Sequence, residues 1–172
     1  GMSAPHLLVI GGARSGKSRY AQQRAEATGL RRIFIATAQV FDAEMRDRID
    51  RHRDDRGPDW ETVECPLGLA EAVTAHAARD AVLLVDCLTL WTSNLILSDA
   101  DCFAATTRLV AALDRARGQV ILVTNEVGLG IVPDNALARR FRDEAGIVNQ
   151  RVAAAVPEVQ LLTAGIALRL KG

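Results

Sequence analysis

The stretch of the chain most suited to chemistry is Gly11-Gly12-Ala13-Arg14-Ser15-Gly16-Lys17-Ser18, which fits the Walker A pattern G-x-x-x-x-G-K-[ST]. Consecutive backbone N–H groups in such a loop form an anion-binding nest, and the glycines let the backbone approach phosphates closely. Lys17 supplies a mobile cation for the β- and γ-phosphates, and the Ser18 hydroxyl can ligate Mg²⁺. The pattern therefore predicts that the chain binds a nucleoside triphosphate.

The segments on either side of this loop fit that role. Residues 7–10 are a short apolar run typical of a buried strand, and residues 17–27 have a helical pattern. Strand, glycine-rich loop and helix is the order that the motif requires, and such a helix points the positive end of its dipole at the phosphates. A glycine-rich turn with a chance Lys-Ser pair is the alternative, which this context disfavours.

A second phosphate-related pattern ends at Asp86, which closes the apolar run 81–85. This is the Walker B form, and with Ser18 it predicts a Mg²⁺ site at the end of a strand. Thr89 and Thr92 follow, and we interpret them either as polar caps at a helix start or as substrate contacts.

Another candidate site loop follows the apolar run 120–124, with the sequence Asn125-Glu126-Val127-Gly128. The guanine-reading N-K-x-D motif of switch GTPases is absent here, which argues against that class. Glu126 at an expected strand end, followed by glycines, is typical of a functional loop. A plain strand-to-helix turn is the alternative.

The charged segment 43–56 predicts a helix with two distinct stripes. Its apolar residues recur at helical spacing and predict a buried stripe: Phe41, Met45 and Ile49. Arg48, His52 and Arg56 share the same spacing on another stripe. A histidine between two arginines suits a nucleophile whose neighbours attract a triphosphate. A solvated face of Arg–Asp pairs is the alternative.

The apolar runs as a whole predict the sheet that positions these groups. Strand-like runs lie at 7–10, 33–36, 82–86, 120–124 and 159–163, and helical patterns lie at 17–27, 43–56, 68–78, 101–117 and 135–156. Continuous apolar runs alternating with helices predict a P-loop NTPase-type α/β fold, a doubly wound, mostly parallel sheet with helices on both faces. A last run, 167–170, is predicted to return as an antiparallel edge strand. Ligands of such sheets bind at the carboxyl ends of the strands.

Composition sets the broad class. Residues 3–172 are expected to form a single P-loop catalytic domain, and Gly1-Met2 reads as a cloning scar. The formal net charge is zero and aromatic residues make up 4%, which argues against nucleic acid as the main partner. No apolar stretch is long enough to predict a membrane span. The 3 cysteines match no metal or redox spacing, so a reducing, cytoplasmic compartment is expected.

Nearly end to end, the chain resembles the bifunctional adenosylcobinamide kinase / adenosylcobinamide-phosphate guanylyltransferases of cobalamin biosynthesis. The residues that carry the resemblance are the Walker A loop, Ile35-Ala36-Thr37-Ala38, Asp42-x-Glu44-Met45, Arg48-Ile49-x-x-His52-Arg53, Trp60-x-Thr62-x-Glu64, Asp86-Cys87-Leu88-Thr89 and Thr124-Asn125-Glu126-Val127-Gly128-x-Gly130-Ile131-Val132-Pro133. The Walker A loop alone marks only a superfamily, whereas the last motif and the Ile-x-x-His-Arg helix are far more specific.

The resemblance implies two reactions. ATP or GTP phosphorylates the aminopropanol hydroxyl of adenosylcobinamide, and GTP then guanylylates a histidine, which passes GMP on to give adenosylcobinamide-GDP. The guanylylated histidine falls on His52, and Mg²⁺ is the implied cofactor. Implied nucleotide contacts, besides the Walker A loop, are Ala36, Thr37, Ala38, Arg53, Asp54, Asp55, Arg56, Glu64 and Asp86. A homotrimer is implied as well, and corrinoid contacts are guessed from position: Thr89, Trp91, Asn94 and Glu126.

Two questions stay open at the level of sequence. The reactions occur at the γ- and α-phosphorus, so either the nucleotide binds in two poses or the His52 helix moves, with Gly57-Pro58 as a possible hinge. Alternative functions are a single-activity P-loop kinase for another hydroxyl substrate and a nucleotide-binding regulatory module that serves a partner protein.

Overall fold

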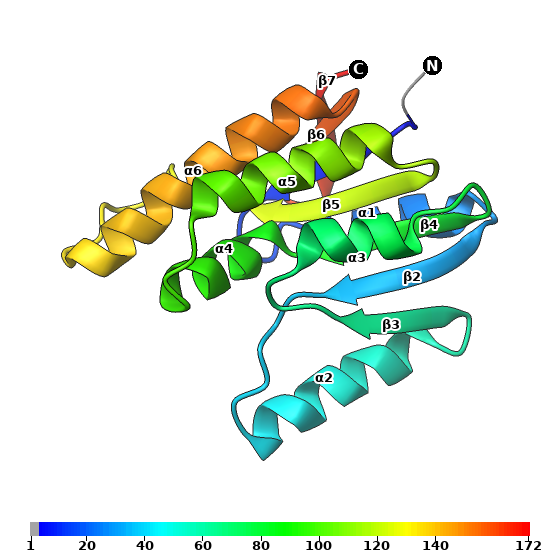
Figure 1. Ribbon diagram of the computed structural model, residues 1–172, viewed down its shortest axis with the longest axis horizontal. Coiled ribbons are helices and arrows are strands. Elements are labelled where there is room, and N and C mark those ends of the chain that lie inside the picture. The colour runs from blue at the N-terminus through cyan, green and yellow to red at the C-terminus, as the bar shows by residue number, and fades with distance from the viewer. Residues whose placement is uncertain (1–3) are drawn as a thin grey trace.

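The computed structural model describes residues 4–172, so the expected cloning scar at residues 1–2 lies outside the described residues. Its centre is a 7-stranded sheet in the order β3-β2-β4-β5-β1-β6-β7 (Figure 1). The strands are β1 (Leu7–Gly11), β2 (Arg31–Ala36), β3 (Trp60–Glu64), β4 (Ala81–Asp86), β5 (Gln119–Asn125), β6 (Glu158–Thr163) and β7 (Ile166–Lys171). The helices are α1 (Lys17–Ala27), α2 (Ala43–Arg56), α3 (Leu69–His76), α4 (Leu88–Leu97), α5 (Cys102–Arg115) and α6 (Ala136–Ala155).

Every strand pair except β6–β7 is parallel, so the sequence prediction of a doubly wound, mostly parallel sheet with an antiparallel last strand is confirmed. The parallel strands end at one edge of the sheet. The loops after β1, β2, β4 and β5 therefore meet there, as expected for the ligand-binding edge of such a fold.

The sheet separates two apolar cores, which explains why the central strands are apolar on both faces. Leu8, Leu83 and Val85 face one core, which α3, α4, α5 and α6 cover. Leu7 and Leu84 face the other, smaller core, which Ala21 and Ala25 of α1 fill. Small residues on α1 let this helix pack close to the strands, and its first turn is thereby held against the end of β1.

Two elements were not predicted from the sequence. Residues 60–64 form the edge strand β3, which pairs with β2, and its polar-apolar alternation differs from the continuous runs of the central strands. Residues 88–97 form α4, in which seven of ten side chains are buried. Polar and apolar residues both fall among its buried positions, so the segment shows no clear helical stripe.

The predicted buried stripe of α2 is wrong. The helix itself forms as expected, because Asp42 caps it by accepting a hydrogen bond from the Met45 N–H at 2.7 Å. However, Phe41 is 71% exposed, Met45 and Ile49 are half-buried, and no residue of α2 is fully buried. The helix lies at the β3 end of the sheet, apart from the other helices (Figure 1). The sheet edge there offers too little apolar surface to cover a whole stripe.

The β6–β7 hairpin turns through Ala164 and Gly165, which both have positive φ (51° and 76°). Thr163 and Ile166 pair directly across this two-residue turn, which is the loop length that favours positive φ at both central residues. The turn lies against the Walker A loop, because the Gly165 N–H donates to the Ser15 carbonyl at 2.8 Å.

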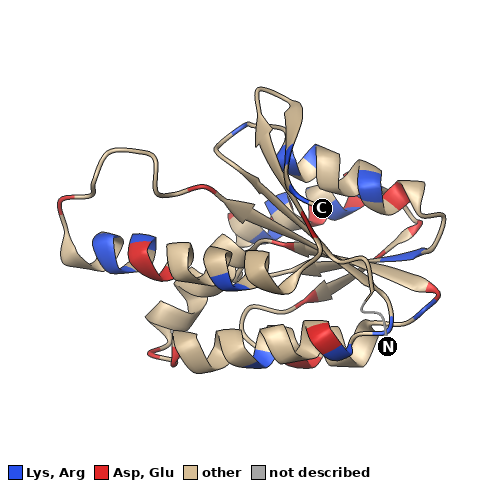
Figure 2. Ribbon diagram, turned by 90° about the horizontal axis from the view of Figure 1, so that it is seen from above, with Lys and Arg blue, Asp and Glu red and all other residues tan. Residues whose placement is uncertain are grey.

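Charged side chains of both signs alternate along the helices, and the loop between β5 and α6 stands out from the body of the molecule (Figure 2). None of the helices among residues 4–172 is both long and apolar enough to cross a bilayer.

Candidate nucleotide-binding and catalytic site

The Walker A loop leaves the end of β1 and runs directly into α1, as the sequence predicts. Gly16 takes a left-handed conformation (φ 91°) immediately before the first residue of the helix, and the Lys17 Nζ donates to the Gly12 carbonyl at 3.0 Å. A Cβ on Gly11 would clash with the Ser15 Oγ and lie 3.1 Å from the Leu162 carbonyl oxygen. Glycine at position 11 therefore lets the loop close without displacing these groups.

Asp86 at the end of β4 lies beside the start of α1. Its Oδ2 is 3.4 Å from the Ser18 Oγ, which donates to it. Burial raises the pKa of the Asp86 carboxyl, while Lys17, Ser18, Arg56 and His52 act in the opposite direction. These cations favour the carboxylate. A hydroxyl and a carboxylate oxygen at this separation fit Mg²⁺, which takes few protein ligands and completes its shell with water and phosphate oxygens.

A cavity of about 390 Å³ opens beside these two residues. Its lining comes from α1, β2, the β2–α2 segment, α2, β4 and α4: Ser18, Gln22, Phe34, Ala36, Ala38, Ile49, His52, Asp55, Arg56, Leu84, Asp86 and Leu90. His52 thus shares one hollow with Ser18 and Asp86, although they lie far apart in the sequence. This arrangement places an exposed imidazole next to the phosphate-binding loop.

Arg56 brings positive charge into this cavity. Its guanidinium stacks over the Phe34 ring at 3.5 Å and donates to the Thr62 Oγ1 at 3.2 Å. Burial lowers the pKa of Arg56, an effect that nearby Asp86 opposes. Its Nε is buried and has no hydrogen-bond partner among the described residues. Because buried donors are normally paired, this group is suited to a ligand that supplies an acceptor.

Several predicted nucleotide contacts lie outside the main cavity. The Thr37 side chain is fully buried behind it and exchanges hydrogen bonds with the Cys87 backbone at 2.8 and 2.9 Å. Arg53 pairs with Asp50 at 2.6 Å, and Asp54 is exposed; neither lines the cavity.

Glu64 lines a second, open hollow of about 430 Å³. Its carboxylate pairs with Arg46 at 2.9 Å. The two hollows share Ala38, so they form adjoining parts of one surface.

Comparison with known proteins identifies the family. The profile described as cobinamide kinase / cobinamide phosphate guanyltransferase matches residues 7–170. The chain belongs to this family. It is 44% identical over 181 residues to the bifunctional adenosylcobalamin biosynthesis protein CobU of Salmonella typhimurium, covering 96% of this chain and 99% of that protein. It is 46% identical over 167 residues to the corresponding protein CobP of Pseudomonas aeruginosa, covering 96% of each. The chain is therefore an enzyme of the cobinamide kinase / guanyltransferase family.

Solved structures of other proteins show the same fold. The flagellar accessory protein FlaH of Methanocaldococcus jannaschii aligns with a TM-score of 0.56 at 15% identity, covering 99% of this chain and 80% of that one. The RadB recombinase aligns with a TM-score of 0.53 at 12% identity, and the alignment covers 94% of this chain and 76% of that one. These likenesses support the P-loop fold and carry no information on substrate.

Three of the four residues predicted from position to contact the corrinoid are buried in this structure. Trp91 is 1% exposed and its Nε1 donates to the Leu67 carbonyl at 2.7 Å. The Thr89 hydroxyl is buried and accepts from the Asn125 N–H at 2.8 Å. Asn94 is buried as well. Only Glu126 remains half-exposed at the sheet edge.

Sequence reasoning missed the structural role of Asn94. Its Nδ2 donates to the Thr37 carbonyl at 2.7 Å and to the Pro66 carbonyl at 2.9 Å. It thereby ties together the loop after β2, which carries Ala38 of both hollows, and the loop after β3, which carries Pro66 of the second hollow. An amide side chain among the mostly buried residues of a helix is the signal that points to such a buried tie.

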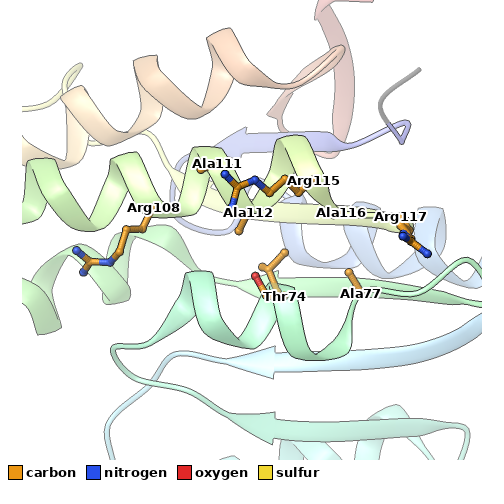
Figure 3. Close-up of a pocket in the computed structure, with 9 residues that line it drawn as sticks. Thr74, Ala77, Arg108, Ala111, Ala112, Arg115, Ala116 and Arg117 are labelled. Atoms are coloured by element: carbon orange, nitrogen blue, oxygen red, sulfur yellow. The ribbon is translucent and has the colours of Figure 1, made fainter. Parts of the chain in front are cut away.

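Another cavity, of about 330 Å³, lies between α3 and α5. Figure 3 shows its lining, in which the side chains of Arg108, Arg115 and Arg117 extend in different directions instead of converging on one point. Arg115 and Arg117 lie at the carboxyl end of α5, where cations offset the helix dipole. None of the predicted site residues lines this cavity, so it is not the candidate active site.

Proposed function

We propose that this enzyme phosphorylates the aminopropanol hydroxyl of adenosylcobinamide with ATP or GTP, and then transfers GMP from GTP through a His52–GMP adduct to give adenosylcobinamide-GDP. The observation that carries the proposal is the single cavity shared by His52, Ser18 and Asp86. The curated relatives, described as bifunctional adenosylcobalamin biosynthesis proteins, support the pair of activities.

The Walker A loop and Lys17 would hold the β- and γ-phosphates. In P-loop proteins the backbone N–H groups and the lysine neutralise charge on these groups, which is stabilisation that grows as a phosphate leaves. Ser18 and Asp86 would hold Mg²⁺, which would offset the negative charge of the phosphates. The assignment of Asp86 to this role rests on the position of its carboxylate beside the Ser18 hydroxyl.

In the guanylyl step, the imidazole nitrogen of His52 attacks the α-phosphorus of GTP. A P–N bond forms, the bond from the α-phosphorus to the α–β bridging oxygen breaks, and pyrophosphate leaves with the electron pair. The phosphate group of the cobinamide then attacks the same phosphorus, which releases His52. Arg56 in the same cavity supports this step, because a guanidinium can bind the transferring phosphate in a fork.

The guanosine part of GTP is proposed to lie over Ala36 and Ala38 and to extend toward Glu64. Both alanines line the cavity, and Ala38 also lines the adjoining hollow that contains Glu64. A carboxylate can accept hydrogen bonds from ribose hydroxyls or from the guanine edge. Arg53, Asp54 and Asp55 are proposed to contact the nucleotide from α2, where Asp55 already faces the cavity.

A cytoplasmic homotrimer is proposed on the basis of the family resemblance. Large exposed apolar side chains on β7 are available for subunit contacts: Ile166, Leu168 and Leu170. Sedimentation equilibrium should give three times the 18.5 kDa chain mass. A single-chain mass across the concentration range would exclude the trimer.

Covalent labelling tests the guanylyl half directly. The wild type and His52→Ala are incubated with Mg²⁺ and GTP labelled at the α-phosphate, without corrinoid, and are then denatured. Acid-labile, alkali-stable label is expected on the wild type alone. His76→Ala, on another helix, is the matched control and should label normally. Absence of label on a wild type that still binds GTP would remove the guanylyltransferase half and favour a single-activity P-loop kinase.

A further inference from the structure

Glu126 lies at the carboxyl end of a strand whose two neighbours lead into the phosphate-related motifs. It follows β5, which lies between β4, the strand of Asp86, and β1, the strand that leads into the Walker A loop. The register pairs Gly11 with Asn125, and the Glu126 N–H donates to the Gly11 carbonyl at 3.0 Å. The backbone of Glu126 is thus hydrogen-bonded to the first residue of the phosphate-binding loop.

Lys17 is held at the same end of the loop. Its Nζ contacts the carbonyl of Gly12, the residue next to the one that binds Glu126. Because the Walker A lysine reaches the β- and γ-phosphates, the γ-phosphate is expected near this point. The backbone of Glu126 therefore lies beside the start of the phosphate-binding loop, whereas His52 lines the main cavity from α2.

The other acidic groups nearby have different partners. Asp86 faces the Ser18 hydroxyl, and Glu64 pairs with Arg46. Glu126 accepts one hydrogen bond, from the Gly128 N–H to its Oε1 at 2.6 Å, which fixes the carboxylate within its own loop. Its Oε2 has no hydrogen-bond partner within residues 4–172 and is free to accept one from a substrate.

The loop that begins with Glu126 also presents apolar surface. Leu129 is 88% exposed and Ile131 is 98% exposed. Exposed groups of this size are typical of surfaces that bind a partner or a large substrate. An acceptor with apolar bulk that lies on this loop would bring its hydroxyl to Glu126 at the base of the loop.

Resting on the proposed function, we propose that Glu126 is the general base of the kinase step. Its carboxylate accepts the proton of the aminopropanol hydroxyl as that oxygen attacks the γ-phosphorus. The new O–P bond forms, the bond from the γ-phosphorus to the β–γ bridging oxygen breaks, and the nucleoside diphosphate leaves with the electron pair. A carboxylate performs this role in protein kinases, where it accepts the proton of the substrate hydroxyl. The guanylyl step at His52 needs no part of this group.

The test measures both half-reactions in the same variants. In Glu126→Gln, kcat for phosphorylation of adenosylcobinamide by ATP should fall about 100-fold, as expected for loss of a general base. The KM for ATP should stay within about twofold, because the phosphate-binding loop is intact. The rate of His52 labelling by α-labelled GTP should also be unchanged. Glu126→Asp should recover part of kcat, whereas Asp134→Asn, an acid-to-amide change at the end of the same loop, should behave as the wild type.

The outcomes separate this inference from the proposed function. A Glu126→Gln enzyme with near-normal phosphorylation would overturn the base assignment, and so would a parallel loss of phosphorylation and of His52 labelling, which would indicate a structural role. A wild type that neither phosphorylates adenosylcobinamide nor labels His52 would instead overturn the proposed function.

Discussion

Replacing Asn94 with alanine should both destabilise the protein and loosen its nucleotide site. The substitution removes two hydrogen bonds from the Asn94 Nδ2, to the Thr37 and Pro66 carbonyls. Each neutral hydrogen bond contributes about 1 kcal/mol net, and a buried carbonyl left without a partner costs about 1–3 kcal/mol. Some compensation by water at the smaller side chain is expected, so we predict a loss of about 2–4 kcal/mol in the free energy of unfolding.

Urea titration followed by circular dichroism measures this loss. Steady-state kinetics at varied GTP concentration measure the effect on KM and kcat. Because Asn94 ties the loop that carries Ala38 of both hollows to the loop that carries Pro66 of the second, the KM for GTP should rise more than kcat falls. Ser98→Ala is the matched control at the end of the same helix, since the Ser98 Oγ bonds only to the nearby Leu95 carbonyl. It should change stability by no more than about 0.5 kcal/mol. A loss below about 1 kcal/mol in Asn94→Ala, with an unchanged m-value, would refute the role of Asn94 in holding the two loops together.

Two further predictions concern the surroundings of the Walker A helix. Hydrogen bonds from Arg24 lower the pKa of Glu158 to about 2, so this ion pair stabilises the fold above the usual Glu pKa and the stability is lost as the pH falls toward 2. At about pH 7 the wild type should be more stable than Glu158→Gln by about 1–2 kcal/mol, after allowance for partial exposure. In urea titrations this difference should shrink by more than half between about pH 7 and pH 3. A difference that stays constant with pH would contradict the prediction. Gly165→Val and Gly29→Val change glycines of similar positive φ (76° and 70°) and should lose similar stability. Only the former touches Ser15 and should weaken Mg-GTP binding, by about tenfold in Kd; equal weakening in both would exclude the hairpin contact as the cause.

The sequence predicts the central sheet well because its signals are local. The apolar runs of β1, β4 and β5 are buried on both faces, so their hydrophobicity alone marks them as strands. The phosphate-binding loop is equally local, since eight consecutive residues carry its chemistry. The shared cavity of His52 and Asp86 was not visible in this way, because it depends on where α2 lies relative to β4.

The errors arise where neighbours decide the environment of a side chain. Phe41 has the spacing of a buried residue and is exposed because α2 lies at the edge of the sheet. Trp91 and Asn94 follow a strand end, as ligand contacts often do, yet both side chains turn inward to hydrogen-bond backbone carbonyls. A single sequence records the type of such a residue but not the carbonyls that surround it.

The weak burial of α2 also has a thermodynamic consequence. Since none of its residues is fully buried, its local opening costs much less free energy than opening of the central strands. A nucleotide that contacts Arg56 and His52 adds its binding free energy to the ordered form of this helix by mass action. Amide hydrogen exchange should therefore slow on α2 in proportion to ligand saturation, so under the proposed function the nucleotide would complete the folding of the helix that carries the proposed nucleophile.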